Sequence, residues 1–211
     1  GVQTCALPIY PTPRNSYYIS DIIKLIPESR FIYMLRDPRD CILSQSVKWK
    51  KYLKINEYMH ALRYKLNYNP KLMAKFWKNS YRGYLRNKND NRVKLVYYEE
   101  IIKNPYEVVS GIAEFLNESV PDNIDLSYIR SDNSFKWKTE FSNSDVFLIQ
   151  SGLSNEIEEI GYENLEVRLF VKFIASIKQF LYFLKLPLAF IVNLNRMKNP
   201  LSIVKTRILK K

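Results

Sequence analysis

The chain has few of the residues on which metal centres, disulfide frameworks and histidine-based catalysis depend. It contains two cysteines, Cys5 and Cys41, and one histidine, His60. Neither cysteine has a partner at metal-ligand spacing, so we expect no disulfide framework and no metal site. A Ser-His-Asp triad would depend on His60 alone, and we discount it. With only five glycines and ten prolines in 211 residues, the sequence also excludes collagen-like and low-complexity chains.

The chain is instead rich in apolar residues and in positive charge. Hydrophobic residues make up 46% of it, which is enough for one globular domain, and its net charge is +12. Residues 165–211 hold ten lysines and arginines and one acidic residue, Glu166, so the first 164 residues carry a net charge of only +3. The positive field therefore predicts an anionic partner for the C-terminal segment. The nearly neutral remainder, which has no recognised binding motif, argues against nucleic acid as a partner.

The first nine residues, GVQTCALPI, differ from the rest of the chain. They lack the basic start and the long apolar stretch of a signal peptide and show no periodicity. Residues 2–9 are what the end of a common short-read sequencing adapter encodes when it is read in frame. We therefore predict that residues 1–9 are an artefact and that the natural chain begins near Tyr10. The alternative is an ordinary flexible N-terminus.

The hydrophobic pattern predicts strands that alternate with helices. The apolar runs FIYML at residues 31–35 and VKLVYY at residues 93–98 are typical of strands, and the first has no polar alternation, as in a strand covered on both faces. Alternation of this kind implies an α/β fold with a parallel sheet. Helices are predicted over residues 16–26, from Pro38 to about Tyr52, twice within 56–87 with a break at Asn69-Pro70, and over 106–116 and 153–162, with a surface loop over 120–144.

The end of the first strand has the features of an anion site. Arg36 follows the strand directly, and ligands of open parallel sheets lie beyond the carboxyl ends of the strands. Asp37-Pro38 suits the N-cap and first position of a helix, so the Asp37 carboxylate would occupy the free helix amides. A phosphate would then be held by side chains, with a guanidinium fork from Arg36 and a hydroxyl from Ser44.

Residues 29–46, SRFIYMLRDPRDCILSQS, resemble the 3′-phosphate-binding strand, turn and helix of sulfotransferases that use 3′-phosphoadenosine-5′-phosphosulfate (PAPS). In that family an arginine and a serine eight residues later bind the 3′-phosphate, and Arg36 and Ser44 have this spacing. Residues 93–116 look like the family's later strand, turn and helix, and Tyr98 falls where the family places a tyrosine near the adenine. Gly161-Tyr162 is similar to the pair that often closes the domain.

A third similarity concerns the loop that covers the cofactor in this family. Arg130 lies seven residues before Trp137, as an arginine and a downstream tryptophan do in the family's loop. The Lys-Gly that follows the family's arginine is absent here, so Lys136 or Lys138 is the alternative cation. The resemblance thus implies a cofactor site made by Arg36, Ser44, Tyr98, Arg130 and Lys136.

The resemblance implies a three-layer, P-loop-like nucleotide-binding α/β fold with an incomplete parallel sheet over residues 10–164. It further implies a cytoplasmic enzyme that transfers a sulfuryl group from PAPS to a hydroxyl or amine of a carbohydrate, a lipid or a small metabolite. The family's 5′-phosphosulfate loop has no counterpart between Tyr10 and Arg36, so we expect a fragment with little or no transferase activity. The general base is unassigned, because Glu28 abuts Pro27 at a helix end and a surface role is expected for His60.

Residues 165–211 predict a basic amphipathic helical tail, in which apolar runs alternate with single lysines or arginines. No uncharged apolar stretch reaches the roughly 18 residues that a membrane span needs. Two interpretations stay open: a helix that lies on an anionic bilayer at the inner membrane face, and a helical pair that packs on the domain. The rival to an enzyme is therefore a peripheral membrane or partner-binding protein with a vestigial nucleotide fold.

Overall fold

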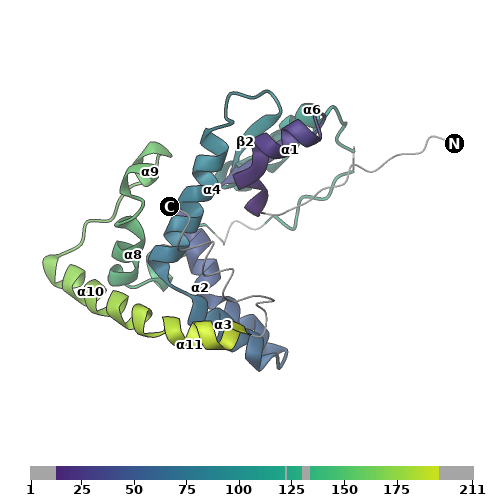
Figure 1. Ribbon diagram of the computed structural model, residues 1–211. Coiled ribbons are helices and arrows are strands. Elements are labelled where there is room, and N and C mark those ends of the chain that lie inside the picture. The colour runs from purple at the N-terminus through teal and green to yellow at the C-terminus, as the bar shows by residue number, and fades with distance from the viewer. Residues whose placement is uncertain (1–12, 122, 130–133, 195–211) are drawn as a thin grey trace. The chain divides into compact units, whose positions relative to one another are not determined.

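The computed structural model describes residues 13–121, 123–129 and 134–194 (Figure 1). Contacts divide the chain into two compact units, one of Gly1–Arg36 with Phe76–Ser131 and one of Asp37–Lys75 with Asp132–Lys211. The predicted artefact at residues 1–9 and the end of the tail, residues 195–211, lie outside the described residues. The described chain is mostly helical and includes a small parallel sheet, which confirms the predicted α/β class.

The sheet of the first unit joins two strands that are far apart in the sequence. Strand β1 (Phe31–Leu35) pairs in parallel with β2 (Val93–Tyr97), and the pairing runs to Leu35 opposite Tyr97. Both strands and their parallel order agree with the prediction. The other elements of this unit are η1 (Pro13–Tyr18), α1 (Ile19–Leu25), the second part of α4 (Pro70–Leu85), α5 (Tyr98–Lys103) and α6 (Pro105–Leu116).

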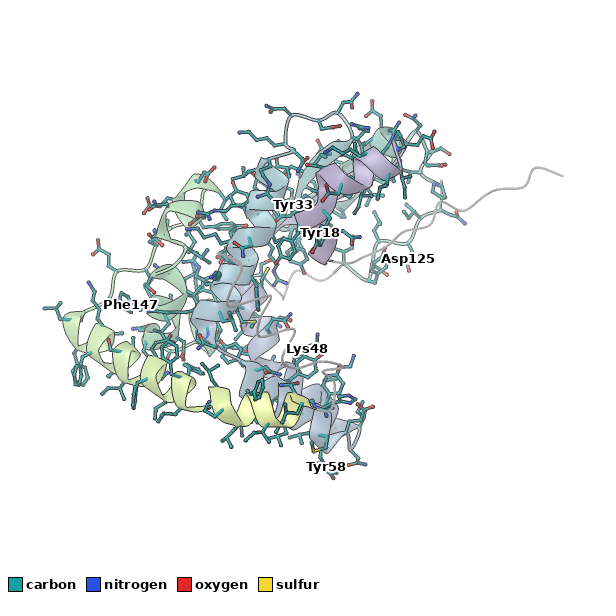
Figure 2. The ribbon with its side chains drawn as sticks, viewed as in Figure 1. Tyr18, Tyr33, Lys48, Tyr58, Asp125 and Phe147 are labelled. Atoms are coloured by element: carbon teal, nitrogen blue, oxygen red, sulfur yellow. The ribbon has the colours of Figure 1, made fainter. Side chains whose placement is uncertain are left out.

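Helices contact both faces of this sheet. On one face the Tyr33 ring of β1 stacks on Tyr84 of α4, with 4.8 Å between the ring centroids (Figure 2). On the other face the Lys94 ammonium of β2 lies 5.7 Å from the centre of the Phe115 ring of α6. The sheet therefore lies between helices, as in an α/β fold.

The expectation that β1 is covered on both faces is only partly right. Ile32 and Met34 point to the face that α6 contacts, and they remain 39% and 53% exposed. Apolar β-favouring residues predict a strand, but the run does not reveal how many neighbours will cover it. This face of β1 is only partly covered.

Helix α4 and η1 approach each other closely at Gly83. A β-carbon at position 83 would lie 2.0 Å from the carbonyl oxygen of Ser16, so a side chain there requires η1 to move. The Ser16 hydroxyl is 2.8 Å from that of Ser80, one turn earlier on α4. The predicted helix over 16–26 is observed as the 3-10 turn η1 followed by α1.

The second unit is helical, and its core forms around Trp137. Leu43, Trp137 and Val146 make a buried cluster against which Phe141 packs. Its helices are α2 (Pro38–Lys54), α3 (Tyr58–Asn67), the start of α4, α7 (Trp137–Glu140), α8 (Asn143–Gln150), α9 (Ser154–Glu159), α10 (Leu169–Leu184) and α11 (Leu186–Asn193).

Three short helices differ from the sequence expectation. Helix α7 and the start of α8 lie in the predicted surface loop over 120–144, and α5 begins directly after β2, where no helix was predicted. Helices of four to eight residues carry too few turns for a clear hydrophobic period. In α7 a tertiary contact supplies the order, because the amide of its first residue, Trp137, donates to the distant carboxylate of Asp40.

The described part of the tail contains the helices α10 and α11, which follow each other almost in line (Figure 1). Helix α10 packs on α8, and α11 packs on α3. Together, Leu169–Asn193 form a 25-residue helix that is long and apolar enough to cross a membrane by length and composition. The sequence prediction required an uncharged apolar stretch, and it did not find this helix because single lysines interrupt it. The packed-pair interpretation thus agrees with the contacts, although one face of the helix remains open.

Candidate functional site

Arg36 and Tyr98 lie at the carboxyl ends of the two parallel strands. Arg36 follows Leu35, the last residue of β1, and Tyr98 follows Tyr97, the last residue of β2, so the pairing of Leu35 with Tyr97 brings them to the same edge. The Arg36 guanidinium carbon lies 4.3 Å from the centre of the Tyr98 ring. A contact of this kind contributes about 0.5–2 kcal/mol and orients the guanidinium plane. The structure thus brings together two of the predicted site residues.

Glu99, the residue after Tyr98, was not predicted as a site residue. Both of its carboxylate oxygens are buried, and neither has a hydrogen-bond partner within the described residues. Buried carboxylates normally have hydrogen-bond partners because water no longer solvates them. Glu99 can therefore accept a hydrogen bond from a hydroxyl or ammonium group of a ligand. Its place two residues beyond a strand is the sequence signal that could have indicated it.

Ser44 is exposed on α2, in the second turn after the helix start. The prediction that Asp37 caps this helix is confirmed, since its carboxylate accepts the amide of Arg39 at 2.8 Å. An incoming anion would therefore meet side chains rather than this helix amide. Arg36 belongs to the first unit and Ser44 to the second, so their joint binding of a phosphate stays a prediction.

Asp37 and Arg39 form a buried ion pair within the second unit. Their side chains are 0% and 2% exposed, and Arg39 Nη2 lies 2.8 Å from Asp37 Oδ2. Arg39 Nη1 donates to the carbonyl oxygen of Glu163 at 2.7 Å. The guanidinium also lies 3.8 Å from the centre of the Trp137 ring, whose Nε1 donates to Asp37 at 2.9 Å. The sequence motif Asp-Pro-Arg-Asp thus supplies a buried ion pair of the second unit and also begins α2.

Asp40 binds the backbone of the segment that holds Lys136. Its carboxylate accepts the Phe135 amide at 2.6 Å and the Trp137 amide at 3.0 Å, so the amides on both sides of Lys136 are fixed. Phe135 has a φ of 58°, a left-handed conformation that costs a bulky residue about 1–3 kcal/mol. The bonds to Asp40 offset this cost. The segment that the sequence assigned to the cofactor loop is thereby fixed to α2.

The predicted cofactor loop also contains Lys136, Lys138, Arg130 and Trp137, which the structure treats differently. Lys136 is half-buried and precedes α7, and the Lys138 ammonium lies 5.4 Å from the centre of the Phe135 ring. Arg130 lies outside the described residues, so its role stays a prediction. Trp137 is 5% exposed and belongs to the core of the second unit.

His60 is a partly exposed histidine on α3 with local partners. Its Nδ1 atom contacts a carboxylate oxygen of Glu57, and its ring centroid is 5.5 Å from that of Tyr52. These contacts agree with the hydrogen-bonded surface role expected from the sequence. We therefore give His60 no catalytic role.

A pocket of about 510 Å³ lies in the second unit, where α8 and α9 meet residues 164–172. Gln150 there donates to Asn164 at 3.0 Å and accepts the Leu165 amide at 3.2 Å. These bonds connect the start of the tail to α8. Of the predicted cofactor residues that the structure describes, none lines this pocket.

Comparisons with known proteins identify the family of this chain. A family model described as the sulfotransferase family matches residues 5–122, more than half of the chain. The chain is also 27% identical over 158 residues to a 3-beta-hydroxysteroid sulfotransferase from Cavia porcellus, an alignment that covers 74% of this chain and 51% of that protein. The chain thus spans about half the length of the curated relative it matches. A search of solved structures gave no significant match.

Proposed function

Because this chain belongs to the sulfotransferase family, we propose that it binds PAPS and serves the transfer of the sulfuryl group to an acceptor hydroxyl or amine. The observation that carries the proposal is the Arg36 guanidinium, which lies against Tyr98 at the carboxyl end of β1. Ligands of parallel sheets bind at this edge, and a guanidinium fork matches the oxygens of a phosphate. The donor set therefore fits an adenosine 3′-phosphate.

Each predicted residue has a part in this proposal. Arg36 donates hydrogen bonds to the 3′-phosphate, and the Ser44 hydroxyl adds one more. The Tyr98 ring, which Arg36 covers on one side, offers its remaining surface to the adenine. Lys136, together with Arg130, supplies positive charge from the loop that approaches the cofactor.

The proposed chemistry depends on position and charge. Sulfuryl transfer parallels phosphoryl transfer: the bond from sulfur to the leaving phosphate oxygen breaks while a bond from sulfur to the acceptor forms, and negative charge grows on the leaving group. Lys136 opposes that charge, while Arg36 holds the nucleotide by its 3′-phosphate so that the sulfur stays in line with the acceptor. The acceptor proton passes to a general base, which we do not assign.

The acceptor is a carbohydrate, a lipid or a small metabolite in this proposal. The relative from Cavia porcellus is named for a hydroxysteroid, which agrees with a hydroxyl acceptor. We place the protein in the cytoplasm, held peripherally at the inner face of a membrane by its C-terminal helices. The open apolar face of those helices supports this location.

Calorimetric titration with adenosine 3′,5′-bisphosphate tests the nucleotide site, because this nucleotide is the product left when PAPS loses its sulfuryl group and it carries the 3′-phosphate that Arg36 and Ser44 are proposed to bind. We expect Arg36→Ala to weaken binding at least about tenfold and Ser44→Ala to weaken it about 2–10-fold, as expected for charged and neutral hydrogen bonds.

Two matched control variants distinguish a loss of nucleotide binding from a general destabilisation of the protein. Arg30 stands before β1, as Arg36 stands after it, and lies over Phe115 at 5.5 Å, so Arg30→Ala should leave the affinity within about twofold. Ser46→Ala is the control for Ser44, because Ser46 donates to the carbonyl oxygen of Leu43 on its own helix. Equal losses for Arg36→Ala and Arg30→Ala would refute the proposed site. Failure of the unaltered chain to bind the nucleotide, with retained vesicle binding, would favour the rival protein with a vestigial nucleotide fold.

A further inference from the structure

Helices α10 and α11 expose a continuous apolar stripe. Its large side chains recur every three or four residues, which places them on one side of a helix. Each is about half exposed or more, and Phe173, Phe180 and Ile191 are 63%, 61% and 60% exposed. Contiguous apolar surface of this kind marks an interaction site rather than ordinary protein surface. The stripe consists of Phe173, Ile177, Phe180, Leu184, Leu188 and Ile191.

The opposite side of the same helices is attached to the second unit. Ala175 and Ala189 are buried there, where their small side chains allow close packing. Lys178 Nζ lies 2.9 Å from Asp145 Oδ2 on α8, and Arg63 Nε on α3 donates to the carbonyl oxygen of Val192 at 3.1 Å. The helices are therefore fixed by one face while the stripe faces outward.

The charges of this segment lie away from the stripe. Leu169–Asn193 contain three lysines and no acidic residue. Lys172 lies 5.8 Å from the Phe147 ring centre on α8 (Figure 2), and Lys185 lies 4.8 Å from the ring centre of Tyr182. Lys178 pairs with α8, as described above. The outward stripe is thus uncharged, and lysines border it on the side of the domain.

The sequence that follows adds charge of one sign. Residues 195–211 contain six lysines and arginines and no acidic residue. An apolar stripe with basic residues around it complements a bilayer surface that contains anionic lipids, because the hydrocarbon accepts the stripe and the headgroups attract the cations. A second protein copy would bring an equal positive charge to this surface and would be repelled by it.

We infer that α10 and α11 lie in the plane of an anionic bilayer, with the Phe173–Ile191 stripe inserted at the boundary between headgroups and acyl chains. The helix is long enough to span, but spanning would break the contacts of Lys178 with Asp145 and of Arg63 with Val192. It would also place lysines in hydrocarbon, which is costly. The interfacial position keeps all of these contacts. This inference adds depth and orientation to the proposed peripheral location, and it does not depend on the transfer reaction.

Vesicle flotation of the full chain tests the inference. We expect the chain to float with vesicles of phosphatidylcholine and phosphatidylglycerol, and much less with phosphatidylcholine alone. The triple variant Phe173→Ser, Phe180→Ser and Leu184→Ser should lose at least about tenfold in partition, since each side chain contributes apolar area. A control triple variant at equally exposed positions outside the tail, Leu25→Ser, Ile26→Ser and Tyr106→Ser, should float as the unaltered chain does.

Depth distinguishes a helix that lies in the interface from one that spans. A Phe180→Trp variant should be quenched more strongly by lipids brominated near the headgroup than by lipids brominated near the chain end, whereas the reverse order would show spanning and overturn the inference.

Equal flotation with neutral vesicles would overturn the role of charge. A dimer in light scattering that the stripe variant abolishes, without flotation, would assign the stripe to a second copy. Nucleotide binding by the stripe variant keeps a failure here separate from a failure of the proposed site.

Discussion

Removal of the Arg39 side chain should destabilise the protein strongly, because it leaves the Asp37 carboxylate buried without its countercharge. The fully buried carboxylate of Asp37 faces the Arg39 guanidinium through Nε at 2.9 Å and Nη2 at 2.8 Å. After Arg39→Met, the donors that remain to the carboxylate among the described residues are the amide of residue 39 and the indole NH of Trp137. Loss of one partner from a buried ion pair costs about 3–5 kcal/mol in the free energy of unfolding.

A second substitution tests whether the uncompensated charge is the cause. Asp37→Asn removes the charge and retains one oxygen, which can accept either the residue-39 amide or the Trp137 indole NH; these two donors bind different oxygens of Asp37. Added to Arg39→Met, it should therefore recover about 2 kcal/mol rather than add a further loss. The measurement is urea unfolding followed by far-ultraviolet circular dichroism, with an unchanged m-value as the check that one transition is compared.

The chain contains a matched control for this ion pair. Asp90 and Arg92 have the same spacing and nearly the same bonds: the Arg92 amide and Nε each lie 2.9 Å from Asp90 Oδ1, and Nη2 lies 2.8 Å from Oδ2. These side chains are 26% and 33% exposed, so water solvates the partner that remains after Arg92→Met. The loss should be far smaller than for Arg39→Met. Equal losses at the two sites would refute the argument from burial.

Two other predictions concern packing and pH. Gly83→Ala should lower the free energy of unfolding by about 1–3 kcal/mol or more in the same urea assay, because the new β-carbon would overlap the Ser16 carbonyl. Gly111→Ala, where the nearest neighbour of the new β-carbon lies at 3.8 Å, should stabilise α6 by up to about 1 kcal/mol. Burial, and then the nearby Asp145 carboxylate, raise the pKa of Tyr182 from 10.0 to about 12. The free energy of unfolding should therefore fall as pH rises from about 10 towards 12, and Tyr182→Phe should make this fall shallower; an unchanged slope would contradict the assignment.

Short-range patterns in the sequence were sufficient for the strands and for part of the site. Apolar runs predicted β1 and β2, and the resemblance placed Arg36 and Tyr98 in one site. The structure brings the Arg36 guanidinium carbon to 4.3 Å from the centre of the Tyr98 ring, because parallel strands end at one edge. The Asp37 cap was also predictable, since a helix N-cap depends on residues only two or three positions apart. Each of these features is decided by neighbouring residues or by a general rule of topology.

Long-range contacts explain what the sequence could not predict. The burial of Arg39 was not predicted, because Trp137 and Glu163, far along the chain, complete its environment. Helix α7 was assigned to a loop because its order depends on Asp40, 97 residues earlier. Joint phosphate binding by Arg36 and Ser44 stays a prediction for a similar reason. Arg36 follows a strand of the first unit and Ser44 lies on a helix of the second unit. Their joint binding depends on how the two units are arranged.

The way Asp40 binds residues 135–137 has an evolutionary consequence. Its carboxylate contacts main-chain amides, which every residue except proline supplies, so the path of this segment does not depend on the identity of the side chains at positions 135 and 136. Mutations can then alter the charge and shape that the segment presents without altering its course. Glycine or asparagine at position 135 would even relax the backbone. Such an anchor lets descendants of one ancestor vary the side chains of this segment while they inherit the same backbone path.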